Sequence, residues 1–327
     1  MTITRLLLML LALALPGALV SGCGSGGGEE SGTATPAAAS TAAAITSNPD
    51  NGKVSLTMGS KNFTEQIVLG EIYAQGLRAA GYDVQTKLDL GDEHVALKAV
   101  ESGEIDAYPE YTGTALRSFF GKQPDELPKD PQDAYAEAKK SFAERGLVAF
   151  PPTPFSSSNE VAVTKETAEK LSLQTISDLK EHAPELTLAG SKECRERLDC
   201  LLGLERVYGL KFGSFMQTPI EDRHEVLTSG KADVSIVFTT DPQIQRESEV
   251  LLEDDESMFG PYNSTLVMRK ETAERAGPDL PKTLELIQAR LTDENMQELN
   301  ARVDLDGQEP AAVAKAYLTE NGLLPTS

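Results

Sequence analysis

The sequence predicts an α/β protein of two lobes, on three observations. From residue 53 onward, segments with the two-residue period of strands alternate with segments that carry helix signals. A proline-rich segment at 150–155 interrupts this series, and a second α/β series follows it. The chain has 327 residues, of which 40% are hydrophobic, and this is enough to bury one or two cores. We therefore expect two lobes joined by extended crossings.

The first 22 residues predict a signal peptide. An apolar run at 6–15 follows Arg5, and it is shorter than the roughly 20 residues that a bilayer-spanning helix needs. The run leads to VSGC at 20–23, which resembles the lipobox of bacterial lipoproteins. This resemblance implies lipid attachment at Cys23, and the alternative is an ordinary secretory cleavage site beside a cysteine. No later stretch is apolar enough to span a bilayer, so we expect an extracytoplasmic protein that only its lipid anchors to the cell membrane.

Residues 23–52 predict a disordered tether after the signal peptide. Between 24 and 50 the chain is almost entirely Gly, Ser, Ala, Thr, Pro and Glu, with Ile45 as its one large aliphatic residue. Such a composition buries too little apolar surface to offset the entropy of folding. We therefore expect the folded body to begin at residue 53.

The first lobe is predicted over 53–151, and it resumes over 242–327. Apolar residues alternate with polar ones at 53–58, as in a half-buried strand. Asn62 and Glu65 predict a helix N-cap with its reciprocal acid. A second strand at 82–88 and a second helix around 95–100 follow. This rhythm predicts a parallel sheet with helices on its faces.

The second lobe is predicted over 152–241. A helix around 168–171 and a strand at 186–189 lead to an apolar strand at 232–238. Thr239, Thr240 and Asp241 close that strand, and we expect the chain to return to the first lobe there. The hinges of any lobe motion are accordingly expected near 151–154 and 239–242.

The cysteines predict one disulfide and no metal site. Without Cys23, the total of 3 leaves Cys194 and Cys200, an even pair in an exported chain. The loop that they close is short, so we expect a contribution of about 2 to 3 kcal/mol and a stiffened surface hairpin. Zinc is the alternative, but none of the histidines lies at ligand spacing from them: His94, His182 and His224. We expect no metal and no cofactor.

Charge excludes some partners. The formal net charge is -21 and the pI is near 4.6, so nucleic-acid phosphates and anionic lipid faces would repel the protein. The simplest interpretation of this acidity is a well-solvated surface.

One chemistry-bearing segment is SKNFTEQ at 60–66, at the carboxyl end of the first predicted strand. It combines free backbone N–H groups at a helix start with the Lys61 cation, the amides of Asn62 and Gln66, and the Phe63 ring. Such a turn suits a carboxylate. The alternative is an ordinary capped helix start.

A second segment is GEIDAYPEYTGT at 103–114, which is dense in tyrosine, threonine and acids. Tyrosine rings attract alkylammonium cations through their π faces, for about 0.5 to 2 kcal/mol each. Tyr108 and Tyr111 flank Pro109, so we expect only one of them to line a cleft. Core packing is the alternative for both.

These two segments, VFTTDPQI at 237–244 and VLLEDDESMFGPY at 250–262 together resemble the substrate-binding proteins of glycine betaine, carnitine and choline ABC importers. The similarity covers nearly all of 53–324. It implies a type II periplasmic-binding-protein fold with the ligand cleft between the lobes. It also implies a quaternary ammonium solute caged by aromatic rings, and permease and ATPase subunits as partners of a monomer.

Carried over by position, the resemblance implies cleft roles for a set of residues: Asn62, Phe63, Gln66, Asp92, Tyr111, Thr114, Thr240 and Tyr262. Many members of the family have Asn-Thr-Tyr at the start of the second lobe, where this chain has Asn159, Glu160 and Val161. One cage wall is therefore missing or is supplied by Phe155, and Glu160 would add a negative charge.

The sequence leaves three alternatives to this function: an enzyme, a sensor and a transport protein for another ligand. An enzyme is disfavoured because the chain has no Gly-x-Ser-x-Gly motif, no free thiol after these assignments and only single histidines. A sensor lipoprotein with the same clamp is an alternative to transport. Within transport, the alternative ligand is a zwitterion without methyl groups, such as an amino acid or a thiol peptide.

Overall fold

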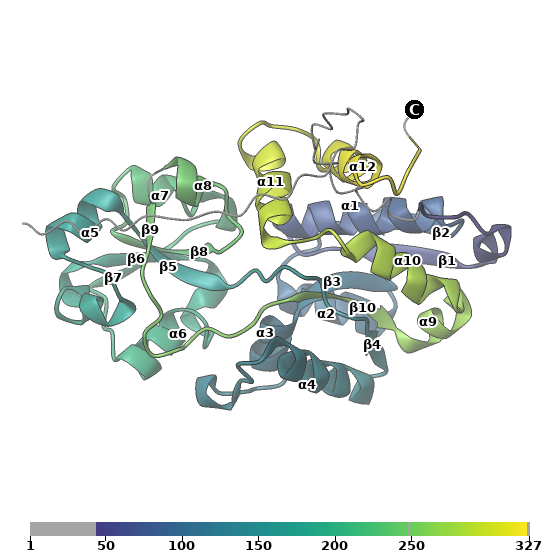
Figure 1. Ribbon diagram of the computed structural model, residues 1–327. Helices are drawn as coiled ribbons and strands as arrows, with labels where there is room; N and C mark the ends of the chain where they lie inside the picture. The colour runs from purple at the N-terminus through teal and green to yellow at the C-terminus, as the bar shows by residue number, and fades with distance from the viewer. Residues whose placement is uncertain (1–43, 248, 326–327) are drawn as a thin grey trace, which may run out of the picture. The chain divides into compact units, whose positions relative to one another are not determined.

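Two five-stranded sheets, each covered by helices, organise the folded body and confirm the two-lobed α/β prediction (Figure 1). The computed structural model describes residues 44–247 and 249–325. The predicted signal peptide at 1–22, the lipidation site at Cys23 and the tether up to residue 43 lie outside the described residues. Within those ranges, no helix combines the length and the apolar character that crossing a bilayer requires.

The first sheet has the strand order β2-β1-β3-β10-β4. Its strands are β1 (Ser55–Gly59), β2 (Asp83–Lys87), β3 (Ala107–Tyr111), β4 (Leu147–Ala149) and β10 (Ser264–Arg269). The helices of this lobe are α1 (Thr64–Ala79), α2 (Glu93–Ser102), α3 (Thr112–Thr114), α4 (Pro131–Glu144), α9 (Lys270–Ala276), α10 (Asp279–Gln288), α11 (Asp293–Asp304) and α12 (Pro310–Glu320). One core cluster joins the sheet to α1 and α10–α12, and a second joins it to α2 and α4. Both faces of the sheet are therefore buried.

The second sheet has the order β7-β6-β8-β5-β9. Its strands are β5 (Asn159–Thr164), β6 (Thr187–Gly190), β7 (Ser214–Gln217), β8 (Val234–Phe238) and β9 (Glu249–Leu251). Its helices are shorter: α5 (Lys165–Leu171), α6 (Leu201–Gly203), α7 (Glu225–Thr228) and α8 (Gln243–Arg246).

Both sheets are mixed, whereas the sequence predicted a parallel sheet for the first lobe. β1 pairs in parallel with β2 and β3, and β6 with β7 and β8. β10 runs antiparallel to β3, and β5 runs antiparallel to β8. Each antiparallel strand is the one that enters its lobe directly from a crossing, so it arrives from the cleft side and runs against its neighbours.

The return crossing lies later in the chain than the sequence predicted. β9 belongs to the second sheet, and Met258 lies in the core of the second lobe. The two crossings run side by side, since Ser156 forms an antiparallel bridge with Asn263. The polar residues at 239–241 close β8 instead of leaving the lobe, because the Asp241 carboxylate accepts the Phe238 N–H at 2.8 Å. The second lobe therefore extends to about residue 259.

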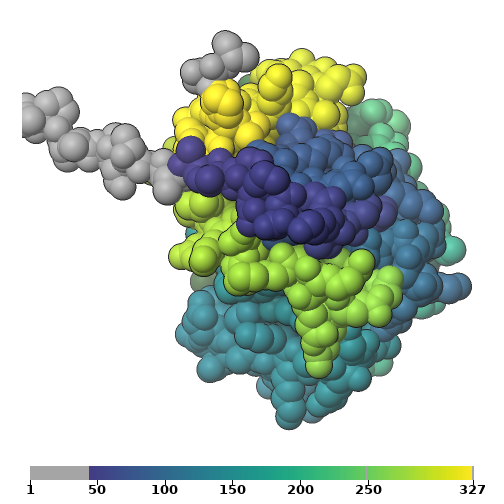
Figure 2. All heavy atoms as spheres, turned by 90° about the vertical axis from the view of Figure 1, so that its right-hand side faces the viewer, coloured from purple at the N-terminus to yellow at the C-terminus, as the bar shows by residue number. Residues whose placement is uncertain are grey.

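The described part of the predicted tether packs on the first lobe. The Ile45 N–H donates to Leu323 O at 3.2 Å, and the Asn51 amide donates to Ala80 O at 2.9 Å. A 3-10 helix spans Pro49–Lys53. In Figure 2 this purple segment lies against the yellow C-terminal helices. The folded body thus begins before residue 53, because Ile45 packs against the core and the buried Asn51 is hydrogen-bonded.

Candidate functional site

A cavity of about 520 Å³ lies where the carboxyl ends of strands from the two sheets face each other. Ligands of open α/β sheets bind at such strand ends. The first lobe contributes Lys61, Asn62, Phe63, Gly91, Asp92, Glu93, Val95, Tyr111 and Thr114. The second lobe contributes Asn159, Gly190, Ser191, Lys192, Glu193, Arg197, Cys200, Gln217, Thr218, Pro219, Ile220, Glu221, Arg223, Ile236 and Phe238, and the crossings contribute Ser157 and Tyr262.

The turn after β1 brings a cation to an aromatic face. The Lys61 ammonium lies 2.5 Å from Glu110 Oε1 and 4.5 Å from the centre of the Tyr111 ring. Lys61 is only 4% exposed and Glu110 is fully buried, so this ion pair is largely removed from water. The π face of such a ring attracts an ammonium.

Tyr111 is fixed from behind by a buried acid. Its hydroxyl donates to Glu65 Oε1 at 2.6 Å, and the Asn300 amide donates to Glu65 Oε2 at 3.0 Å. Burial, together with the Glu65 charge, raises the pKa of Tyr111 well above its usual range, so the hydroxyl stays a donor. Burial also raises the pKa of Glu65.

These contacts correct the predicted N-cap of α1. The helix begins at Thr64 with Phe63 as its N-cap, and no side chain caps it. Glu65 points inward to Tyr111 instead of back to the helix start, because its buried carboxylate accepts hydrogen bonds from the Tyr111 hydroxyl and the Asn300 amide.

Three aromatic rings from both lobes lie next to one another. The Phe63 ring stacks on Tyr111 with centroids 6.3 Å apart and planes 21° apart. It also meets Phe238 of the second lobe at 5.4 Å. The Arg223 guanidinium lies 4.7 Å from the centre of the Phe238 ring, on the second-lobe side. The cavity thus has an aromatic wall with a protein cation near each end.

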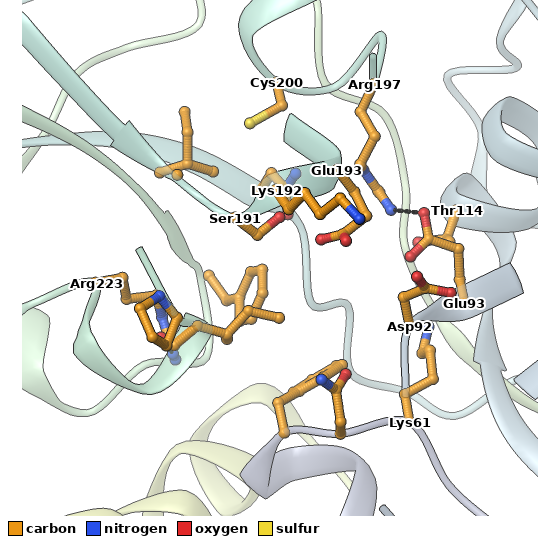
Figure 3. A pocket seen from close by; sticks show the side chains of 18 of the residues that line it. Lys61, Asp92, Glu93, Thr114, Ser191, Lys192, Glu193, Arg197, Cys200 and Arg223 are labelled. Atoms are coloured by element: carbon orange, nitrogen blue, oxygen red, sulfur yellow. Dashed lines mark hydrogen bonds and ion pairs between the residues drawn. The ribbon is translucent and has the colours of Figure 1, made fainter. Parts of the chain in front are cut away.

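The second lobe supplies buried ion pairs. Arg197 Nε donates to Asp199 at 2.7 Å, and Nη1 pairs with Glu93 of the first lobe, as the dashed line in Figure 3 marks. Burial alone would raise the pKa of Asp199, but the Arg197 guanidinium holds it at about 2. The Tyr262 hydroxyl donates to Asp199 Oδ2 at 2.7 Å. Arg197 therefore connects the two sides of the cavity.

Arg223 is held by a second network. Its Nε donates to Asp241 at 2.7 Å, and His224 lies between Asp241 and Glu249, 2.9 Å from each. Burial alone would raise the pKa of Asp241, but Arg223 holds it at about 2. Burial opposes the charged imidazole, yet hydrogen bonds to Asp241 and Glu249 leave the pKa of His224 raised.

Most of the predicted site residues meet at the cavity. Eight of them line it: Lys61, Asn62, Phe63, Asp92, Tyr111, Thr114, Asn159 and Tyr262. Asp92 has a structural task as well, since its carboxylate caps α2 through the backbone N–H groups of His94 and Val95.

Three predicted residues do not line the cavity. Gln66 is buried, and its Oε1 accepts the Lys61 N–H at 3.4 Å. Phe155 is fully buried in the first-lobe core, so it does not replace a cage wall. Thr240 is buried, and its hydroxyl shares a 2.9 Å hydrogen bond with Ser157. Glu160 also lies outside the cavity lining.

Val161 stands where many family members have the tyrosine, and it is fully buried in the second-lobe core, so it presents no ring to the cavity. The side-chain amide of Asn159 donates to Asp199 O at 2.9 Å and supports the second-lobe wall. Phe238, which the sequence analysis did not select, supplies an aromatic ring from that lobe.

The disulfide between Cys194 and Cys200 is confirmed, but its place differs from the prediction. The cysteines are 1% and 2% exposed, and Cys200 lines the cavity, so the disulfide does not close a surface hairpin. In the described ranges, no group of three or more histidine, cysteine or acidic side chains is arranged to hold a metal ion.

Sequence reasoning missed six charged residues of the cavity lining: Glu93, Lys192, Glu193, Arg197, Glu221 and Arg223. The cysteine pair was a usable signal for Arg197, which lies inside it together with its partner Asp199. Glu93 is 104 residues away from Arg197, and nothing local marks that pairing.

Comparison with known proteins gives a consistent family assignment. A family model described as the substrate-binding domain of the ABC-type glycine betaine transport system matches residues 54–320. A glycine-betaine-binding protein of Pseudomonas aeruginosa is 35% identical over 280 residues, which are 82% of this chain and 88% of that protein. The chain therefore belongs to the substrate-binding proteins of glycine betaine ABC transport systems, which are transport proteins and not enzymes.

Two further similarities bear on fold and ligand range. A crystal structure of a glycine betaine/carnitine/choline ABC transporter protein superposes with a TM-score of 0.66 at 26% identity, covering 82% of this chain and 99% of that one. An ergothioneine transport permease/binding protein of Helicobacter pylori is 31% identical, over 82% of this chain and 48% of that protein. This chain thus corresponds to about half of the latter.

Proposed function

We propose that this protein is an extracytoplasmic lipoprotein that captures a quaternary ammonium solute, such as glycine betaine, choline or carnitine, for an ABC importer. The observation that carries the proposal is the aromatic wall of Phe63, Tyr111 and Phe238 beside the cavity. The family assignment agrees with it.

The aromatic wall suits a methylated ammonium in particular. Such a cation has no N–H group, so rings can enclose it without leaving a buried donor unpaired. The Lys61 ammonium over Tyr111 already demonstrates a cation on one of these rings. The solute ammonium would lie against the Phe63 and Phe238 faces.

Another part of the cavity wall suits a carboxylate. Arg197 lines it and carries positive charge, and the Thr114 hydroxyl is a further donor. Charge-assisted hydrogen bonds from groups such as a guanidinium are the strong ones. A zwitterion would therefore place its anionic end beside Arg197 of the second lobe and Thr114 of the first.

Binding would draw the lobes together. The segments that join them are the crossings at 150–158 and 260–263, and these would absorb the rotation in place of the hinge expected at 239–242. The closed form would signal occupancy to the permease and ATPase. Cys23 would hold the monomeric protein at the membrane through its lipid.

Titration calorimetry of the purified protein with glycine betaine, choline, carnitine and proline tests the ligand class. We expect at least one methylated ammonium solute to bind tenfold or more tightly than proline. Equal or tighter binding of proline would overturn the quaternary ammonium assignment while leaving the family assignment intact.

A non-methylated amino acid or thiol peptide is the second candidate. Val161 supports it, because a buried aliphatic side chain stands where many family members place a cage tyrosine. The Helicobacter pylori relative is named for ergothioneine, which carries a trimethylammonium group and so falls in the first ligand class. Cysteine belongs in the same titration series.

A further inference from the structure

The loop that the disulfide closes forms part of the cavity wall. It runs from Cys194 to Cys200, and Arg197 and Cys200 line the cavity. Three of its residues reach outside the loop. Arg197 pairs with Glu93, the Leu198 carbonyl accepts Arg117 Nη1 at 2.6 Å, and Asp199 accepts the Tyr262 hydroxyl at 2.7 Å.

These contacts connect the loop to the first lobe and to the return crossing. Glu93 begins α2, and Arg117 follows α3 in a π-helical turn. Tyr262 lies in the return crossing, between the second-lobe core and β10. The loop therefore connects the second lobe directly to the first lobe and to the return crossing.

Little regular structure holds this loop in place. It contains the end of a short 3-10 helix, Lys192–Arg195, and its turns are closed by single backbone hydrogen bonds such as Cys200 N to Arg197 O at 3.2 Å. The disulfide attaches both of its ends to the second-lobe core. A side chain at position 190 would meet Cys194 Sγ at 2.7 Å, so the glycine at the end of β6 lets the loop approach that closely.

We propose that the Cys194–Cys200 disulfide is a positioning element of the solute site. It holds the Arg197 guanidinium and the Asp199 carboxylate at the cavity wall, and its loss weakens solute binding more than it weakens the fold. The inference rests on the proposed function, since Arg197 is taken to meet the solute.

The test compares the full chain with a Cys194→Ser/Cys200→Ser variant. Cys23 is unchanged in both. We expect the dissociation constant for glycine betaine, or for the tightest probe of the titration series, to rise at least tenfold. The melting temperature should fall by only about 5 °C, because the closed loop is short.

A double-mutant cycle separates positioning from general destabilisation. Arg197→Ala alone should weaken binding. Adding the two serine substitutions to it should weaken binding by less than about twofold further, because the side chain that the disulfide positions is already gone. Independent, additive losses would overturn the proposal. An unchanged dissociation constant in the serine variant would overturn it as well.

Hydrogen exchange without any solute distinguishes failure of this inference from failure of the proposed function. Peptides that cover 191–200 should exchange faster in the serine variant, while those of β6 and β8 stay protected. Equal exchange in that loop would overturn the positioning role. If the loop exchanges faster but the oxidised protein binds no quaternary ammonium probe, the positioning role stands and the proposed function fails.

Discussion

The two lobes share one strand order, yet they give the cavity different walls. In each sheet the central parallel strand, β1 or β6, lies between two parallel neighbours, and the next strand is the antiparallel one. The loops or end residues of the same three parallel strands line the cavity in both lobes. The shared topology decides where the solute site lies, and it leaves the chemistry open.

The first-lobe wall combines aromatic rings with the buried Lys61 ammonium. Lys61, Phe63 and Tyr111 come from two short segments, and the acids behind them, Glu65 and Glu110, are buried and hydrogen-bonded. The second-lobe wall instead depends on Arg197 and Arg223, each held by its own aspartate. The comparison teaches that aromatic rings dominate the first-lobe wall and arginines the second-lobe wall, with Phe238 as the second lobe's own ring.

Removal of a buried charge that supports the second-lobe wall should give the largest change, a loss of unfolding free energy. Arg223→Met leaves Asp241, which is 4% exposed, with His224 as its remaining charged partner. Breaking a buried pair in this way costs about 3 to 5 kcal/mol of unfolding free energy. Urea unfolding measures it. Lys192→Met, an exposed cation of the same wall, is the matched control. Equal stabilities of the two variants would mean that Arg223 is not structurally required.

Mutation of Glu160 tests whether the second lobe also contains a buried acid whose charge no neighbouring cation balances. Burial, aided by the Asp254 charge, raises the pKa of Glu160 to about 8. The folded state thus favours the protonated carboxyl, so stability is full below the ordinary pKa near 4.5 and is lost as the pH rises through 8.

Glu160→Gln should therefore match the parent protein near pH 4 and exceed it by about 1 to 3 kcal/mol near pH 9. Unfolding free energies over this pH range provide the measurement, with the exposed Glu253→Gln as control. A difference that is constant with pH would contradict the raised pKa.

Mutation of Phe63 tests the first-lobe wall through its effect on the affinity for the solute. The ring is half-buried at the cavity and touches the aromatic rings of both lobes. Phe63→Ala should weaken a quaternary ammonium ligand at least tenfold, or about 1.4 kcal/mol, with a small change in melting temperature. Calorimetry checks the affinity. Phe238→Ala is the second-lobe counterpart. If only this variant lost affinity, the second lobe and not the first would supply the ring that the solute needs.

The smallest effect is expected at Lys192. Its side chain is exposed at the cavity margin, where water and salt screen its charge. Lys192→Gln should change the affinity less than threefold at 0.15 M salt. A tenfold loss would mean that the second-lobe margin, and not Arg197, meets the solute anion.

The sequence predicted the first-lobe side of the site better than the second. SKNFTEQ and GEIDAYPEYTGT are continuous, so the residues that they bring together are already neighbours in the chain. Arg197 meets Glu93 from a position 104 residues away, and no local pattern marks that pairing. The misplaced return crossing has a similar cause, since the residues at 239–241 end a strand whether or not the chain then leaves the lobe.

By itself, the sequence determined the alternation of strands and helices, the first crossing at the proline-rich segment and the cysteine pair. Those features depend on periodicity and on the local chemistry of proline and cysteine. Tertiary structure alone decided that the disulfide loop faces the cavity, that Glu65 turns to Tyr111 and that Phe238 supplies a ring. These outcomes depend on which strand ends face one another across two separate sheets, and a contact between distant residues is fixed only when both sheets have formed.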